Sequence, residues 1–307
     1  MPKCWVIGDA AVDLIPDGSD YLKLPGGTGA NIAVALSRLG INSALITKVG
    51  SDSTATFLID KLKRENVNTE NISICEQYKT NLIKASIDET GERHFTYMAK
   101  PSADSQLTNL DIPTFKENDW LCISGFIFVQ RPSREATFFA IKKAKSVGST
   151  VCVDANIRMD MWDDESLVIP TIMKSLKEAD VAKMSDDELL LLTNSKSVEE
   201  GVNKIKDWPS KVKIITLGVK GAILLTKNSE FKIKGFNVPT VDMTGAGDAF
   251  IGALVSKLMQ LDNWTDEKLI KAIKFSNACG ALVVEKKGAM SALPDLETVN
   301  KFIIGEH

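Results

Sequence analysis

The segment 240–250 (Thr-Val-Asp-Met-Thr-Gly-Ala-Gly-Asp-Ala-Phe) combines the residue types that transfer of a phosphoryl group to a hydroxyl requires. Gly245, Ala246 and Gly247 are small enough for their backbone N–H groups to converge on one anion at the start of the apolar helix that we expect over 249–261. Asp248 then lies in the first turn, beside those donors, where a carboxylate can act as a base. An ordinary turn followed by an acid at a helix N-terminus is the alternative interpretation of these residues taken alone.

A second glycine-rich segment, Pro-Gly-Gly-Thr-Gly-Ala-Asn at 25–31, also precedes an expected helix. Its glycines permit close backbone approach to a ligand, and Asn31 in the first turn can bridge hydroxyls. The chain contains no Walker A lysine loop and no protein-kinase catalytic motifs. It also lacks a Gly-x-Gly-x-x-Gly after the first strand, which argues against a dinucleotide-dependent oxidoreductase.

These segments lie within a regular alternation of apolar strands and amphipathic helices. Such an alternation predicts an α/β fold with a doubly wound, mostly parallel sheet, and ligands then bind beyond the carboxyl ends of the strands. We expect the strands at 4–8, 43–49, 120–124, 150–154, 181–184 and 212–217, helices at 30–39, 55–65, 133–147 and 166–179, a hairpin at 222–226 and 230–234, and a helical C-terminal third.

Two segments, about 12–24 and 81–98, do not follow this alternation of strands and helices. Their half-polar alternation and the turn signals at Asp17-Gly18 and Thr90-Gly91 predict paired short strands. A small sheet built from both would form a lid over the site, and a decorative β insertion is the alternative. No linker separates domains, so residues 1–307 are expected to form one domain. The free edges of the lid strands also suggest a homodimer.

Net charge, the length of apolar runs and the distribution of cysteines argue against several classes of protein. A net charge of −3 with mixed signs gives no reason to expect nucleic acid or an anionic membrane as a partner. Apolar runs are too short to span a bilayer, and the N-terminus lacks the apolar region of a signal peptide. Five scattered cysteines indicate reduced core thiols, so we expect a cytoplasmic protein.

The two glycine-rich segments together, at opposite ends of the chain, resemble the signatures of the PfkB (ribokinase-like) carbohydrate kinase family. The segments 7–16, 95–97, 154–158 and 287–294 look most like bacterial fructokinases and aminoimidazole riboside kinases. The resemblance covers essentially the whole chain. It implies a phosphotransferase that moves the γ-phosphoryl of ATP to a sugar hydroxymethyl, most simply fructose to fructose 6-phosphate. An aminoimidazole riboside or another nucleoside or ribose is the alternative acceptor, and a catalytically dead binding protein on the same fold is the alternative of another class.

In the family's pattern Asp248 is the base, and the N–H groups of Gly245, Ala246 and Gly247 stabilise the phosphoryl oxygens. The resemblance implies sugar contacts from Asp13, Gly27 and Asn31, with Tyr97 and Arg158 as contacts typical of the fructokinase-like branch. Lid packing for Tyr97 and a surface ion pair with Asp160 or Asp163 for Arg158 are the alternatives. Asp9 and Asn156 are further candidates for this part of the site.

For ATP, the resemblance points to the turn containing Thr216, Gly218 and Gly221, to Asn277 beside the adenine, and to Lys183 near the phosphates. An exposed polar position is the alternative for Asn277. The sequence departs from the family at Ser185, where many members carry Asn in Asn-x-x-Glu, while Glu188 remains. A role for Glu188 through a Mg²⁺-bound water is therefore expected to survive, and a helix capping box of Ser185 with Glu188 is the alternative.

Many family members are activated by a monovalent cation next to the anion hole. Asp242 and Thr244 match one half of that site. Backbone oxygens around Val283, Lys286 and Gly288 would supply the other half, with Ser291 nearby, and hard oxygen ligands suit K⁺. The cofactors implied are therefore ATP, Mg²⁺ and K⁺.

Overall fold

The computed structural model describes residues 2–18, 20–87 and 93–305. A nine-stranded sheet forms its centre, in the order β13-β12-β11-β10-β9-β8-β1-β4-β5. The strands from β11 to β5 run parallel, whereas β12 and β13 form an antiparallel hairpin at one edge. Their bounds are β1 Cys4–Ile7, β4 Ser43–Gly50, β5 Ile72–Cys75, β8 Trp120–Ser124, β9 Thr150–Asp154, β10 Val181–Ser185, β11 Val212–Thr216, β12 Ala222–Leu225 and β13 Glu230–Ile233.

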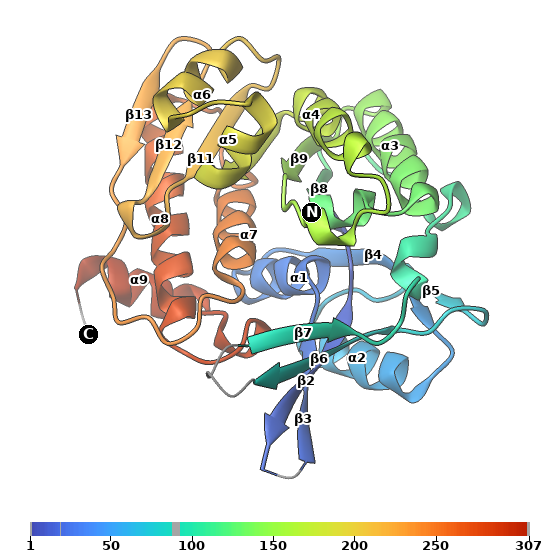
Figure 1. Ribbon diagram of the computed structural model, residues 1–307. Helices are drawn as coiled ribbons and strands as arrows, with labels where there is room; N and C mark the ends of the chain where they lie inside the picture. The colour runs from blue at the N-terminus through green and yellow to red at the C-terminus, as the bar shows by residue number, and fades with distance from the viewer. Residues whose placement is uncertain (1, 19, 88–92, 306–307) are drawn as a thin grey trace.

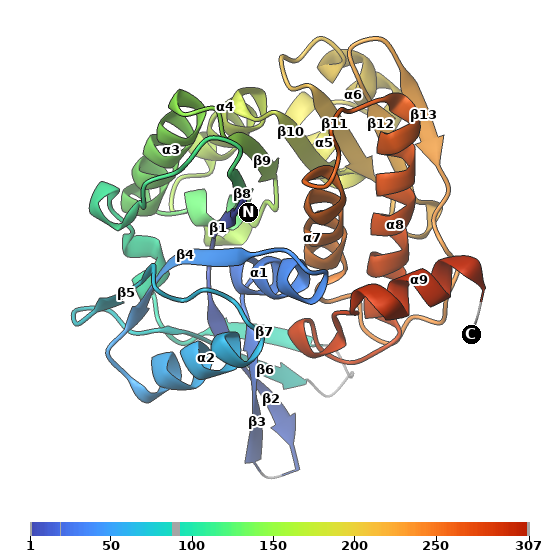
Figure 2. The ribbon, with the colours of Figure 1, turned by 180° about the vertical axis from the view of Figure 1, so that it is seen from behind.

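Helices cover both faces of this sheet, because its central strands are apolar on both sides (Figures 1 and 2). In β1, Cys4 and Val6 belong to one buried cluster while Trp5 and Ile7 belong to the other. The first cluster includes the helices α1 Thr28–Arg38, α2 Ser53–Arg64, α7 Ala246–Leu258, α8 Asp266–Val284 and α9 Leu296–Ile304. The second includes α3 Arg131–Ser146, α4 Val168–Glu178, α5 Asp186–Thr193 and α6 Val198–Ile205.

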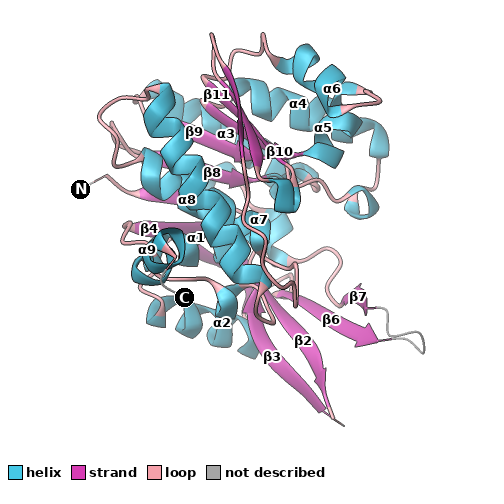
Figure 3. Ribbon diagram, turned by 90° about the vertical axis from the view of Figure 1, so that its left-hand side faces the viewer, coloured by secondary structure: helices cyan, strands magenta, loops and turns pink. Residues whose placement is uncertain are grey.

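A separate four-stranded sheet, in the order β3-β2-β6-β7, projects beyond the core (Figure 3). Its strands are β2 Ala11–Asp17, β3 Asp20–Gly26, β6 Asn81–Ile87 and β7 Arg93–Tyr97. The hairpins β2–β3 and β6–β7 are antiparallel, and β2 pairs with β6 in parallel. The predicted small sheet from two distant segments is therefore confirmed, whereas the predicted turn at Thr90-Gly91 lies outside the described residues.

The predicted fold class is confirmed, and the differences lie in the details of elements. Strand β5 and helix α6 were not predicted, because they have only four and eight residues. Helix α5 entered only through the capping-box alternative, because it is short and its periodic signal is weak. The helix predicted from Ser166 begins at Val168, because residues Glu165–Leu167 form a 3₁₀ turn.

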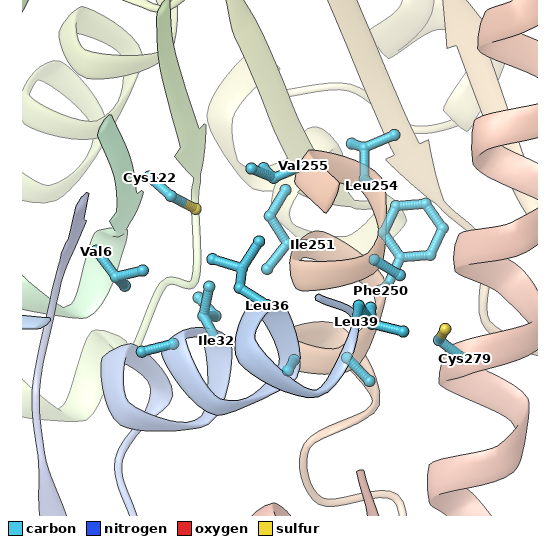
Figure 4. Close-up of a cluster of buried hydrophobic side chains, with 14 of the residues drawn as sticks. Val6, Ile32, Leu36, Leu39, Cys122, Phe250, Ile251, Leu254, Val255 and Cys279 are labelled. Atoms are coloured by element: carbon cyan, nitrogen blue, oxygen red, sulfur yellow. The ribbon is translucent and has the colours of Figure 1, made fainter. Parts of the chain in front are cut away.

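The contact between α1 and α7 is the part of the core that positions the site. Figure 4 shows Ile32 and Leu36 of α1 facing Ile251 and Val255 of α7, and all four side chains are buried. These helices come from opposite ends of the chain and both start at the same edge of the sheet. Their N-terminal turns therefore meet.

Candidate active site

The first turn of α7 has the geometry expected of an anion site with an adjacent base. Gly245 is the N-cap with φ 84°, a left-handed conformation that disfavours other residues. A Cβ there would lie 2.7 Å from the Ala289 Cβ, so the site has no space for a side chain. The helix begins at Ala246, which puts Asp248 in the first turn, where it is 8% exposed.

Asp248 is held by Asn31 from the first turn of α1. The Asn31 Nδ2 donates to Asp248 Oδ2 at 2.8 Å, although 217 positions separate the two residues. The second amide atom, Asn31 Oδ1, is buried with no hydrogen-bond partner among the described residues. A buried acceptor without a partner is costly, so this oxygen is suited to accept from a ligand hydroxyl.

The charge state of Asp248 suits a base. Burial, the largest cause, raises the pKa of its carboxyl to about 7, against the hydrogen bond from Asn31, which lowers it. The carboxylates of Asp154 and Asp9 raise this pKa further and the Lys183 ammonium lowers it. A base with a pKa near the working pH combines a useful ionised fraction with strong proton affinity.

The glycine-rich segment before α1 packs against the segment that carries Asp9 and Asp13. Gly27 has φ 91°, and a Cβ there would lie 2.7 Å from the Ala10 Cα, so only glycine fits. Asp13 lies on β2 opposite Leu24 of β3. Burial, then the charge of Asp9, raises the pKa of Asp13 to about 6. The structure therefore brings Asp9, Asp13 and Gly27 together at the junction of lid and core.

Tyr97 closes this side of the site from β7. Its ring lies nearly parallel to that of Phe126, with centroids 6.5 Å apart and an interplanar angle of 17°. The pKa of Tyr97 is raised by burial and then by the charges of Asp9 and Asp160, whereas Arg158 lowers it. Tyr97 therefore packs against the core and also lies near Arg158. The Arg158 guanidinium is exposed and donates to the Ile157 carbonyl.

A chain of polar contacts links Asp9 to the loop that carries Arg158. Thr28 N donates to Asp9 Oδ1 at 3.0 Å, and the Thr28 and Ser124 hydroxyls are 2.6 Å apart. Asn156, which has φ 34°, donates from Nδ2 to Ser124 Oγ at 2.9 Å. The network joins the ends of β1, β8 and β9, so Asn156 has a structural role in orienting the loop.

The candidate nucleotide residues Thr216, Gly218, Gly221 and Asn277 line one cavity of about 220 Å³, together with Gly247. Asn277 is buried, so the alternative of an exposed polar position is wrong. Its Nδ2 donates to the Lys234 carbonyl at 3.1 Å. The apolar part of the lining, which suits the faces of a base, includes Val219, Phe236, Val238, Met243 and Phe250.

Lys183 lies in the middle of β10, and its side chain reaches the first turn of α7. It forms a buried ion pair with Asp154 of β9, with Nζ 2.8 Å from Oδ1. A Cβ built on Gly247 would be 3.6 Å from Lys183 Nζ, so the ammonium lies against residues 245–247, which we call the anion loop. Asp154 belongs to a segment used for family resemblance, but no chemical role was predicted for it. Its register opposite Lys183 becomes visible only in the sheet.

Ser185 and Glu188 form the capping box that was the alternative interpretation. Ser185 N donates to Glu188 Oε2 at 2.7 Å, and Glu188 N donates to Ser185 Oγ at 3.2 Å. The other carboxylate oxygen, Oε1, accepts from Ile157 N at 2.8 Å. Each carboxylate oxygen keeps a further lone pair, so this arrangement fits a metal-bound water better than direct metal ligation.

The candidate cation residues come from two adjoining segments, the turn before α7 and the C-terminal end of α8 with the residues that follow it. Asp242 Oδ1 accepts from the N and Oγ1 of Thr244, and its Oδ2 accepts from Gly288 N at 3.1 Å. At the C-terminal end of α8, the Val283 carbonyl accepts from Lys286 N. Carboxylate and carbonyl oxygens gathered in one place match the ligands of a hard monovalent cation.

A second cavity, of about 420 Å³, lies beside Tyr97 and contains two residues that the sequence did not single out. Asn81 and Asp104 are each 2% exposed, and each has an Oδ1 without a partner among the described residues. Burial, then the charge of Asp9, raises the pKa of Asp104 to about 7. No local spacing marks either residue, since each follows an irregular segment.

Within residues 2–18, 20–87 and 93–305, no group of three or more His, Cys, Asp or Glu side chains is placed to hold a metal ion. In the same part of the chain, no helix is both long and apolar enough to cross a membrane.

Comparison with known proteins places this geometry in a family. The model of the pfkB family carbohydrate kinases matches residues 1–296. The fructokinase of Vibrio alginolyticus is 40% identical over 305 residues, which are 99% of this chain and 99% of that protein.

Two solved structures share the whole fold. A fructokinase double mutant from Vibrio cholerae O395, in a fructose, ADP and potassium ion bound form, has a TM-score of 0.93 and 41% identity, covering 98% of each chain. The aminoimidazole riboside kinase of Salmonella enterica, complexed with aminoimidazole riboside and an ATP analogue, has a TM-score of 0.91 and 34% identity, covering 98% of this chain and 99% of that one. With Asp248 and the anion loop in place, this chain belongs to the pfkB family of carbohydrate kinases, phosphotransferases that act on an alcohol group.

Proposed function

We propose that this protein is an ATP-dependent fructokinase that produces fructose 6-phosphate. The observation that carries the proposal is the Asn31–Asp248 hydrogen bond, which leaves the Asn31 Oδ1 as an unpartnered buried acceptor next to the base. A sugar hydroxyl that donates to this oxygen would bring its neighbouring hydroxymethyl group within reach of Asp248.

In the proposed reaction, Asp248 accepts the proton of the hydroxymethyl group as its oxygen attacks the γ-phosphorus of ATP. An alcohol does not ionise at neutral pH, so a positioned base is needed. The N–H groups of Gly245, Ala246 and Gly247 donate to the phosphoryl oxygens during transfer.

The remaining candidates bind the two substrates. We assign the sugar to Asp13, Gly27 and Asn31, with Tyr97 covering it from the lid and Arg158 at the rim. A carboxylate can accept from two adjacent hydroxyls, which suits Asp13. We assign the nucleotide to the cavity lined by Thr216, Gly218, Gly221 and Asn277, with Lys183 beside its phosphates.

Two ions complete the proposal. Mg²⁺ held by the nucleotide would reduce the phosphate charge, and Glu188 would accept from one of its waters. K⁺ would be held by oxygens of Asp242, Thr244 and the loop containing Val283, Lys286 and Gly288, next to the anion loop that it would stabilise.

Steady-state turnover of the purified protein with a panel of sugars and MgATP tests the proposal. We expect fructose to have the highest kcat/KM. The Asp248→Asn variant should keep sugar binding, because asparagine can still accept the hydrogen bond from Asn31. It should lose turnover by several orders of magnitude, because an amide cannot accept the proton. Unchanged turnover of this variant would contradict the role of Asp248.

An aminoimidazole riboside is the second candidate acceptor. The nearly parallel rings of Tyr97 and Phe126 favour it, because aromatic faces suit a flat heterocycle. Thermal shifts with fructose and with the riboside separate the two, since the true ligand stabilises the folded state by mass action. Turnover of the riboside without turnover of fructose would overturn the substrate assignment and leave the reaction class intact.

We also propose a homodimer formed through the lid. Edge strand β3 carries Tyr21 and Leu22, which are 37% and 50% exposed, and an exposed strand edge tends to pair. Size-exclusion chromatography with light scattering should give twice the mass of the chain. A monomer at micromolar concentration would contradict this.

A further inference from the structure

Lys183 and Asp154 form a charged pair that is almost fully removed from water. Their side chains are 7% and 3% exposed, and the two residues lie directly opposite each other on the parallel strands β10 and β9. Burying either charge alone would be costly, so each needs the other. The register of two central strands therefore holds the ammonium in one place.

The lysine faces two groups of the proposed reaction. Its ammonium lies against Gly247 of the anion loop, and its charge interacts with Asp248. Of its three N–H donors, one is donated to Asp154 at 2.8 Å in the described chain. The other two can donate to oxygens of a phosphoryl group bound at the loop.

Asp154 decides which carboxylate the lysine pairs with. The other acidic charges that act on Lys183 are those of Glu188 and Asp248. Glu188 already accepts two backbone N–H groups. Without Asp154, the ammonium would therefore be attracted to Asp248, and a carboxylate paired with an ammonium is a weaker base.

We propose that Asp154 is a positioning residue that holds Lys183 against the transferring phosphoryl group and keeps it from neutralising the base Asp248. This inference rests on the proposed phosphoryl transfer. The pair would then have two effects. It places a cation next to the charge that develops on the phosphoryl group, and it leaves Asp248 ionised and able to accept a proton.

The proposal predicts that the two partners affect the pH profile differently. The groups facing Asp248 are Asn31, Asp154, Asp9 and Lys183, of which Asp154 raises its pKa and Lys183 lowers it. Asp154→Asn removes the raising charge and leaves the ammonium uncompensated, so both changes lower the pKa of Asp248. Lys183→Met removes the lowering charge, so the pKa of Asp248 should not fall.

The experiment compares pH profiles of kcat/KM for fructose at saturating MgATP. In Asp154→Asn we expect the acidic limb to move down by about one pH unit, and kcat at its plateau to fall about tenfold, since a weaker base removes the proton less well. In Lys183→Met we expect kcat to fall about 100-fold, as for loss of one donor to a developing oxyanion, without a downward shift. Lys271→Met, which breaks the exposed pair with Glu267, is the control and should match the wild type.

If kcat falls equally in Asp154→Asn and Lys183→Met and the acidic limb stays at the wild-type pH in both, the proposal is overturned and the pair is only structural. If Asp154→Asn does not fold, the double variant Asp154→Asn/Lys183→Met supplies a neutral pair, which proteins often tolerate. It should lose kcat as Lys183→Met does, and wild-type kcat in it would also overturn the proposal.

A measurement without turnover separates this inference from the proposed function. The carboxyl ¹³C shift of Asp248, assigned by its loss in Asp248→Asn, reports its pKa directly. A lower pKa in Asp154→Asn supports the electrostatic role even if fructose is not the acceptor, and an unchanged one contradicts it. Failure of the wild type with every sugar and riboside would refute the proposed function instead.

Discussion

Replacing Gly252 by alanine should lower activity by moving two helices apart. Gly252 of α7 faces Ala35 of α1, one helical turn below the contact between Asp248 and Asn31. Each of these helices therefore presents, four residues apart on one face, a packing residue and an active-site residue. The packing distance at Gly252 therefore sets the separation of the Asn31 and Asp248 side chains.

The size of the displacement follows from the contact. A Cβ on Gly252 would lie 2.7 Å from the Ala35 Cβ, whereas ordinary contacts begin at 3.4 Å, so the helices must separate by about 0.7 Å. The Asn31–Asp248 bond, now 2.8 Å, lies one turn away and would lengthen by a similar amount. Alanine gains about 1 kcal/mol in helix propensity and overpacking costs about 1–3 kcal/mol, so the net change in stability is small.

The assay measures kcat, kcat/KM and Tm together. For Gly252→Ala we expect kcat to fall at least about tenfold, because a 1 Å misplacement costs up to about 100-fold, while Tm changes by only a few degrees. The double variant Gly252→Ala/Ala35→Gly removes the clash and should recover most of the lost kcat. Wild-type kcat in the single variant, or no recovery in the double variant, would refute the reasoning.

Three further predictions concern titration and loop anchoring. The acidic limb of kcat/KM for fructose should lie near pH 7, because Asp248 must be ionised and burial raises its pKa to about 7; a limb near pH 4 would contradict this. Asp104 has a pKa of about 7 when folded, above its unfolded value, so the folded state binds the extra proton and stability is lost as pH rises from about 4 to 7. Asp104→Asn should therefore raise the free energy of unfolding at pH 8 by about 2–4 kcal/mol and have little effect at pH 4, as measured by urea denaturation at both pH values. The buried Lys213 donates to the carbonyls of Lys206, Trp208 and Ser210, and Lys213→Met should cost about 2–4 kcal/mol of stability. Its kcat should stay at the wild-type value, because this loop enters β11 at the end opposite Thr216; a lower kcat in the folded variant would contradict that.

Local patterns explain why much of the fold could be predicted. The strands at Cys4–Ile7 and Trp120–Ser124 are apolar on both faces, so their sequences indicate a parallel sheet without further context. The short helix α5 was missed because it has only a weak amphipathic pattern. Its start was nevertheless encoded locally, in the capping box of Ser185 and Glu188.

The candidate site divides in the same way. The glycine turn before Asp248 and the segment before Asn31 are visible in the sequence because each makes its own backbone geometry within a few residues. Two features could not be predicted: the unpartnered Oδ1 of Asn31 and the burial of Asp104. Both depend on packing against residues that are far away in the chain. The role that we propose for Asp154 could not be predicted for a related reason, because it depends on the register of β9 against β10.

The sequence by itself therefore determined the class of this protein and the chemistry of its two motifs, since helix starts, tight turns and strand polarity are local properties. Only the tertiary structure decided that Asn31 holds Asp248 and that Lys183 is paired with Asp154. Both contacts join segments brought together by burial of apolar faces, of α1 on α7 and of β9 beside β10. That burial is driven by the hydrophobic effect, which is non-directional and depends on the apolar area removed from water. No single segment therefore specifies its partner.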